Sequence, residues 1–152
     1  MSEKMAETDN TSFLTQFKGS FYGVLKWPQL DQLWEVLRQQ NEKLWFIYHV
    51  GEPPPTESVS ADALSRFITE VDELLRSEHK EDYCGIVYAD NLQNPTFIKI
   101  FDPNNLGVSC GFSDNPPLPG WVLSLSKPED LPHAFPPTQS RRRWWQRLFH
   151  HG

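Results

Sequence analysis

The sequence contains few cysteines, no long apolar run and no recognisable phosphate-binding or metal-binding motif. Cys84 and Cys110 are the only cysteines among 152 residues, and no apolar secretory signal opens the chain, so we expect reduced thiols in a cytoplasmic protein. The absence of a stretch of about 18 apolar residues excludes a membrane-spanning helix. Because C-x-x-C, histidines at ligand spacing and a glycine-rich phosphate loop are all missing, the sequence predicts neither a metal ion nor a cofactor.

Positive charge is scarce everywhere except at the C-terminal end. The net charge is −6, yet the last twelve residues hold four of the 14 basic residues and none of the 20 acidic ones. Residues 1–140 therefore have a balance of −10, which repels a phosphate backbone and argues against a nucleic-acid partner. The basic end is suited to an acidic patch on a protein or to an anionic membrane surface.

Length and composition predict one α+β domain with two appended segments. A chain of 152 residues is long enough for one compact domain, and 38% apolar with 22% charged residues is a globular composition. We expect a flexible leader over residues 1–18, the domain over 19–127, a proline-rich linker over 128–139 and a basic aromatic tail over 140–152.

The central pair of strands is predicted over residues 84–88 and 96–101. Both runs are rich in β-branched and aromatic residues, and turn residues separate them, so they predict antiparallel neighbours. Within the second run Ile98 and Ile100 alternate with Lys99, as in a strand with one buried side. Three further strands are predicted over 20–26, 43–50 and 121–125, and the strand at 43–50, apolar on both faces, is expected in the centre of the sheet.

Two amphipathic helices are predicted to cover this sheet. The first begins at Trp27-Pro28 and the second is capped by Ser60. Their apolar stripes follow helical spacing and comprise Leu30, Leu33, Trp34 and Leu37 in the first helix and Leu64, Phe67, Ile68, Val71, Leu74 and Leu75 in the second. The order β-α-β-α-β-β-β predicts a mixed, mostly antiparallel sheet of about five strands with both helices on one face.

The tail carries the strongest functional signal in the sequence. Wound as a helix, its apolar side chains share an arc of about 140°, and arginines flank them. The apolar anchors are Trp144, Trp145, Leu148 and Phe149, and the cations are Arg141, Arg142, Arg143 and Arg147. Such a short helix is marginal alone in water, so it should fold against something. Tryptophan beside arginine is typical of protein-interface anchors and of helices that lie on anionic membranes.

The composition of the tail allows two interpretations of its role, and a function based on a thiol is the alternative that does not involve the tail. In one interpretation it captures a protein partner or a membrane face, which makes the protein a non-catalytic accessory or adaptor protein. In the other it folds back on its own acidic domain. We favour capture, because a proline-rich stretch precedes the tail. The alternative function is a small thiol-dependent enzyme, or a redox or metal-binding protein, that uses Cys110 and Cys84, each followed by glycine. Cys84 begins a predicted strand and is expected to be a small buried side chain. His49 is expected to be a residue of the core or of its rim.

Overall fold

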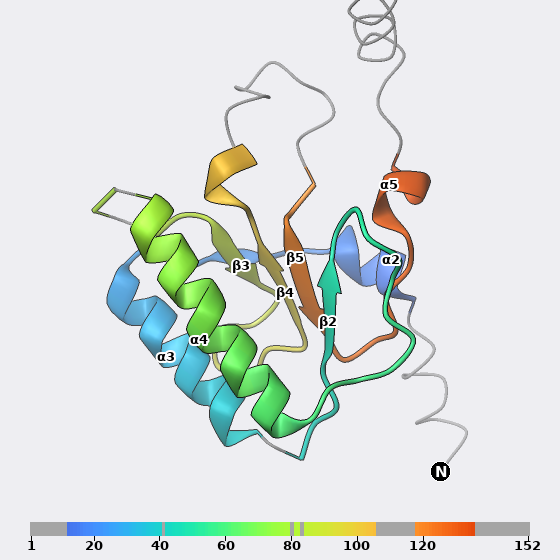
Figure 1. The fold of residues 1–152 in the computed structure, drawn as a ribbon, viewed down its shortest axis with the longest axis horizontal. Helices are drawn as coiled ribbons and strands as arrows, with labels where there is room; N and C mark the ends of the chain where they lie inside the picture. The colour runs from blue at the N-terminus through green and yellow to red at the C-terminus, as the bar shows by residue number, and fades with distance from the viewer. Residues whose placement is uncertain (1–11, 41, 80, 83, 106–117, 136–152) are drawn as a thin grey trace, which may run out of the picture.

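The computed structural model describes residues 12–40, 42–79, 81, 82, 84–105 and 118–135, which form an α+β domain around one five-stranded sheet (Figure 1). The strand order is β1-β3-β4-β5-β2, and every pair of neighbouring strands in these residues is antiparallel. In chain order the elements are α2 (Phe13–Phe17), β1 (Tyr22–Gly23), α3 (Trp27–Gln39), β2 (Phe46–His49), α4 (Ala61–Glu78), β3 (Val87–Ala89), β4 (Phe97–Ile100), η1 (Pro103–Asn105), β5 (Trp121–Ser124) and α5 (Leu131–Ala134).

The predicted fold class is confirmed, together with the central strand pair. β3 and β4 are antiparallel neighbours, with Val87 opposite Ile100. The predicted central position of residues 43–50 is wrong, because β2 forms an edge of the sheet and β5 lies between β4 and β2. β2 is apolar on both faces because both faces of the sheet are covered, even at this edge: Ile47 packs on one side and Tyr48 on the other.

α3 and α4 lie side by side on one face of the sheet, as the apolar stripes predicted (Figure 1). Ser60 caps α4, since its hydroxyl accepts a hydrogen bond from the backbone N–H of Ala63 at 3.1 Å. The stripe positions Leu30, Leu33, Trp34, Leu37, Leu64, Ile68, Val71 and Leu75 are all buried. None of the helices in the described ranges is both long and apolar enough to cross a bilayer.

The two long helices are also joined by a polar cluster on their outer side. Arg76 of α4 pairs with Asp72 at 3.0 Å and with Asp31 of α3 at 2.6 Å. The indole N–H of Trp34 donates to the same Asp72 carboxylate at 3.0 Å. Hydrogen bonds that involve charged groups are stronger than neutral ones, so this cluster orients α3 against α4.

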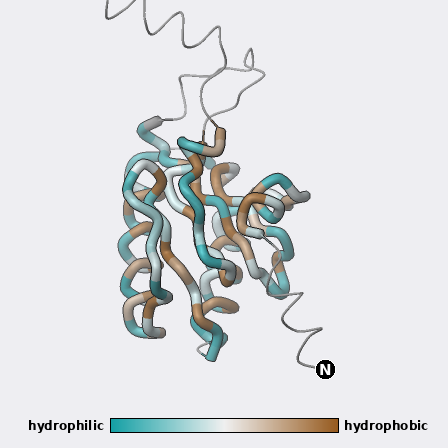
Figure 2. The backbone as a smooth tube through the Cα atoms, turned by 90° about the vertical axis from the view of Figure 1, so that its right-hand side faces the viewer, coloured by the Kyte–Doolittle hydropathy of each residue, from teal (hydrophilic) through white to brown (hydrophobic). Residues whose placement is uncertain are grey.

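The second face of the sheet is covered by α2 and α5, so the sheet lies between two layers of helices (Figure 2). Phe13 of α2 and Leu131 of α5 are buried there against Phe97 of β4. The expectation that β4 has one buried side is therefore wrong. Residues 12–18 and 128–135 also belong to this packed unit rather than to a flexible leader and a linker. Their helices span five and four residues, too short for a periodic pattern in the sequence.

Candidate functional site

The predicted binding residues of the tail lie outside the part of the chain that the structure describes. These residues are Arg141, Arg142, Arg143, Trp144, Trp145, Arg147, Leu148 and Phe149. The structure describes the chain up to Phe135, five residues before the tail begins.

α5 is the last described helix before the tail, and it packs on the sheet. Asp130 caps this helix, and its carboxylate accepts a hydrogen bond from the backbone N–H of His133 at 3.1 Å. The backbone N–H of Leu131 donates to the phenolic oxygen of Tyr48 at 3.1 Å, and both side chains are fully buried. The aromatic ring of Phe135 packs on that of Phe17, with 5.3 Å between the ring centroids. The end of α5 is thus held by the sheet and by α2 together.

The Tyr48 phenol is an unusual anchor because it is buried and lies near a carboxylate. Burial raises the pKa of Tyr48 above its usual value, and the negative charge of Asp130 raises it further. The phenol therefore remains neutral through the physiological range, and it keeps its hydrogen bond to the N–H of Leu131.

A cavity of about 280 Å³ lies beside α5, and we call it the α5 cavity. Its walls come from the ends of β2 and β4, from the residues before β5, and from Pro132 of α5. Gly51 directs the chain away after β2, with a φ of 104° that a residue with a side chain rarely adopts. A side chain at Gly120 would place its Cβ 3.0 Å from the Cβ of Asp102, so only glycine fits there without a shift. Both glycines belong to the lining of the α5 cavity.

His49, expected as a rim or core residue, is largely exposed and lines the α5 cavity. Its ring stacks on Trp121, with 5.6 Å between centroids and an interplanar angle of 15°. Its Nδ1 is 4.0 Å from a carboxylate oxygen of Glu52, and both side chains are largely exposed. Among the described residues no group of three or more histidine, cysteine or acidic side chains could hold a metal ion.

Of the two cysteines in the alternative thiol hypothesis, the structure describes only Cys84. Cys84 is fully buried, and burial raises the pKa of its thiol above the usual value. A thiol in this environment is protonated and inaccessible, as expected for a small core side chain. Cys110 lies outside the described residues, so the reactivity of the second thiol stays a prediction.

Lys99 is a half-buried cation that the sequence pattern did not single out. Its ammonium nitrogen lies 4.0 Å from the ring centroids of both Phe17 and Phe21, on the face covered by α2. Burial lowers the pKa of Lys99 to about 8. Only the packing of residues 13–21 on the sheet brings these two rings to the lysine, and the alternation in residues 96–101 does not indicate it.

Comparison with known proteins returned no match, either to a family model, to a curated protein or to a solved structure. The chemistry of this chain and the geometry of its described residues are therefore the grounds for the function proposed below.

Proposed function

We propose that this protein is a non-catalytic accessory or adaptor protein that binds a protein partner through its tail. In this proposal Trp144, Trp145, Leu148 and Phe149 are the apolar anchors, and Arg141, Arg142, Arg143 and Arg147 contact carboxylates on the partner. Interfaces of this kind obtain most of their affinity from a few buried aromatic and arginine side chains.

One structural observation carries most of the proposal: both faces of the sheet are already covered by helices from within residues 13–134. The core on one face is closed by α3 and α4, and the core on the other by α2 and α5. The domain therefore needs none of the aromatic side chains of the tail to complete its core. This favours the use of those side chains on another molecule.

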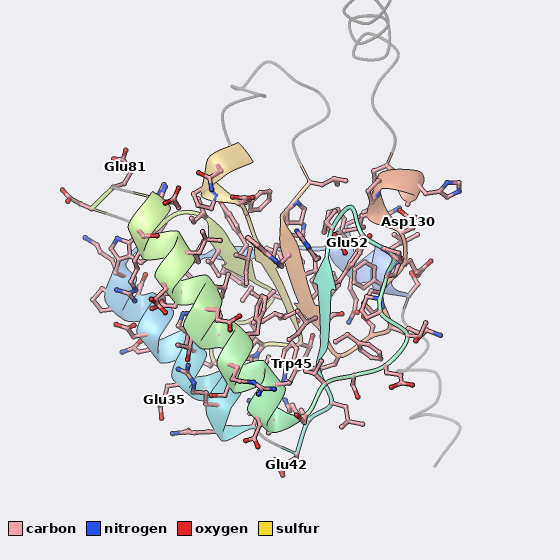
Figure 3. The ribbon with its side chains drawn as sticks, viewed as in Figure 1. Glu35, Glu42, Trp45, Glu52, Glu81 and Asp130 are labelled. Carbon is pink, nitrogen blue, oxygen red and sulfur yellow. The ribbon has the colours of Figure 1, made fainter. Side chains whose placement is uncertain are left out.

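The anchoring of α5 adds a geometric constraint on the partner. Five peptide units separate Phe135 from Ser140, and a fully extended chain of that length spans about 18 Å at most. The anchors begin at Trp144, nine peptide units from Phe135, so a partner held by the tail contacts it within about 32 Å of α5. Glu52 and Asp130 lie at the end of the domain that carries α5 (Figure 3), so acidic side chains are within that distance.

The proposal is tested by comparing the intact chain with a chain that ends at Thr138. The intact chain should retain a protein partner in a pull-down and the shortened chain should lose it, while the circular dichroism and thermal midpoint of the domain stay unchanged. Trp144→Ala combined with Trp145→Ala should also abolish retention. The matched control is His150→Ala combined with His151→Ala, which alters the same segment without touching the anchors. Unchanged retention by the shortened chain would contradict the proposal.

An anionic membrane surface is the second target that the tail composition fits, and vesicles distinguish it from a protein. Binding to vesicles rich in phosphatidylserine that high salt abolishes would indicate lipid, since such attraction is screened by ions. Saturation at a fixed ratio of the two proteins would indicate the protein partner proposed here. If the tail instead folds back on its own domain, the shortened chain will have a lower thermal midpoint.

A further inference from the structure

The two edges of the sheet, β1 and β2, differ in how they are protected. Residues 51–59, which include three prolines, run beside β2 (Figure 1), and the backbone N–H of Val59 donates to the C=O of Trp45 at 2.8 Å. At the other edge, residues 19–25, which contain β1, include neither a proline nor a charged residue. Charge and proline, two common features that prevent an edge strand from pairing with another chain, are therefore missing at β1.

The same edge carries two of the three large apolar side chains that are exposed in the described part of the chain. Tyr22 of β1 is 61% exposed, and Leu25, two residues after β1, is 60% exposed. The third is Leu44, which precedes β2 at the opposite edge. Single apolar side chains are common on a surface, but an apolar strand edge is a template for pairing with another strand.

The hydrogen bonds of β1 show which of its backbone groups face away from the sheet. The N–H of Val24 donates to the C=O of Val87 at 2.8 Å, and the residue before it, Gly23, lies opposite Tyr88. Hydrogen-bonded and non-hydrogen-bonded pairs alternate between antiparallel strands, so the N–H and C=O of Gly23 point away from β3. Phe21, two residues earlier, has the same direction, and no backbone hydrogen bond involves it within the described residues.

Leu25, the next residue along this edge, already uses its backbone groups within the domain. Its N–H donates to Oε1 of Gln29 at 3.1 Å, and its C=O accepts a hydrogen bond from the N–H of Cys84 at 2.9 Å. Within residues 21–25, Phe21 and Gly23 are therefore the residues whose backbone can pair with an added strand.

We propose that two copies of this chain form a symmetric dimer through their β1 edges. An antiparallel strand that pairs with both free residues of each copy must place Phe21 of one copy opposite Gly23 of the other. Each of these two pairs exchanges both of its N–H···O=C hydrogen bonds. Tyr22 of one copy then lies opposite Tyr22 of the other on the two-fold axis, in a non-hydrogen-bonded pair, where side chains are closest.

The surface at β1 fits a second copy because it is complementary to itself. In the proposed register the same residues pair with each other in both directions, as a two-fold interface requires. The two tyrosine rings, exposed in one copy, can pack against each other across the axis. The protein has a net charge of −6, but residues 19–25 are uncharged, so two copies can approach here without like charges in the paired strands.

Sedimentation velocity of the full chain over a range of concentrations tests this proposal. The native protein should change from monomer to dimer as its concentration rises. Tyr22→Lys and Tyr22→Glu each place two like charges opposite each other on the axis, so each should raise the dissociation constant of the dimer by about tenfold or more. An equimolar mixture of the two variants should recover a dimer with one copy of each, because opposite charges then face each other. Leu44→Lys adds a charge at an equally exposed side chain near the other edge, and as the matched control it should dimerise like the native protein.

Two results would overturn the proposal. The first is a native protein that stays monomeric at every concentration up to about 1 mM. The second is a dimer that both Tyr22 variants retain and that is lost when Trp144→Ala and Trp145→Ala are combined, which means that the copies associate through the tail. Tyr22 is exposed, so its variants should fold, and circular dichroism verifies this. Because Tyr22→Lys leaves the tail unchanged, it should still retain the partner proposed above, and the two proposals can fail separately.

Discussion

Replacing Leu131 by alanine tests whether α5 belongs to the folded domain. Leu131 is fully buried against the second face of the sheet, and truncating such a leucine typically lowers the free energy of unfolding by about 2–5 kcal/mol. α5 has only four residues, so it can detach locally, and the loss then cannot exceed the free energy that holds it on the sheet. We therefore expect the lower end of this range, about 2–3 kcal/mol.

Tyr48→Phe examines the same anchor through its hydrogen bond. It removes the acceptor for the buried N–H of Leu131 while it keeps the ring in the core. A buried donor left without a partner destabilises by about 1–3 kcal/mol, and detachment of α5 again lowers the cost, so we expect about 1–2 kcal/mol. The double variant should lose less than the sum of the two single losses, because either change alone releases the same short helix.

The measurement is urea denaturation followed by circular dichroism, with hydrogen exchange of the Leu131 amide as a local readout. His133→Ala is the control, since His133 is an exposed residue of the same helix and its change should stay within about 0.5 kcal/mol of zero. A loss for Leu131→Ala no larger than that of His133→Ala would refute the packing of α5. That result would instead support the flexible linker that the proline content of residues 128–139 predicted.

Two further predictions concern the half-buried Lys99 and the buried Cys84, both away from the tail. Burial lowers the pKa of Lys99 to about 8 in the folded protein, against 10.5 for the unfolded chain. Between pH 8 and 10.5 Lys99 is therefore mostly protonated in the unfolded chain and mostly neutral in the folded protein. The free energy of unfolding should consequently rise with pH across that window. Urea denaturation at pH 7.5 and pH 10 should show this rise in the native protein relative to Lys99→Met, and parallel behaviour of the two would contradict it. For Cys84, alkylation in a Cys110→Ser background should be far slower than that of a free thiol until denaturant is added, because the thiol is buried and its pKa is raised. A native-state rate equal to that of the model thiol would show that Cys84 is accessible.

The long helices were predictable because each repeats its apolar residues over several turns. In α4 the stripe and the cap at Ser60 are local features, and the structure confirms both. The position of β2 was not predictable from its own residues. A strand whose residues are apolar on both faces is expected wherever both faces of the sheet are covered. This pattern is the same for a central strand and for an edge strand such as β2.

The candidate sites differ in the same way. The arginines and tryptophans of the tail stand together in the sequence, so composition alone indicates binding. The α5 cavity joins residues from the ends of β2 and β4, the approach to β5 and α5, and no spacing in the sequence indicates their convergence.

The sequence by itself determined the fold class, the two amphipathic helices, the central strand pair and the contrast between an acidic domain and a basic aromatic tail. These follow from periodicity and composition, which are local properties of a chain. Only the tertiary structure decided that Phe13 and Leu131 cover the second face and that β2 is an edge strand. The physical reason is that burial and hydrogen-bond pairing depend on residues far apart in the chain, whose proximity exists only after the sheet and its helices have assembled.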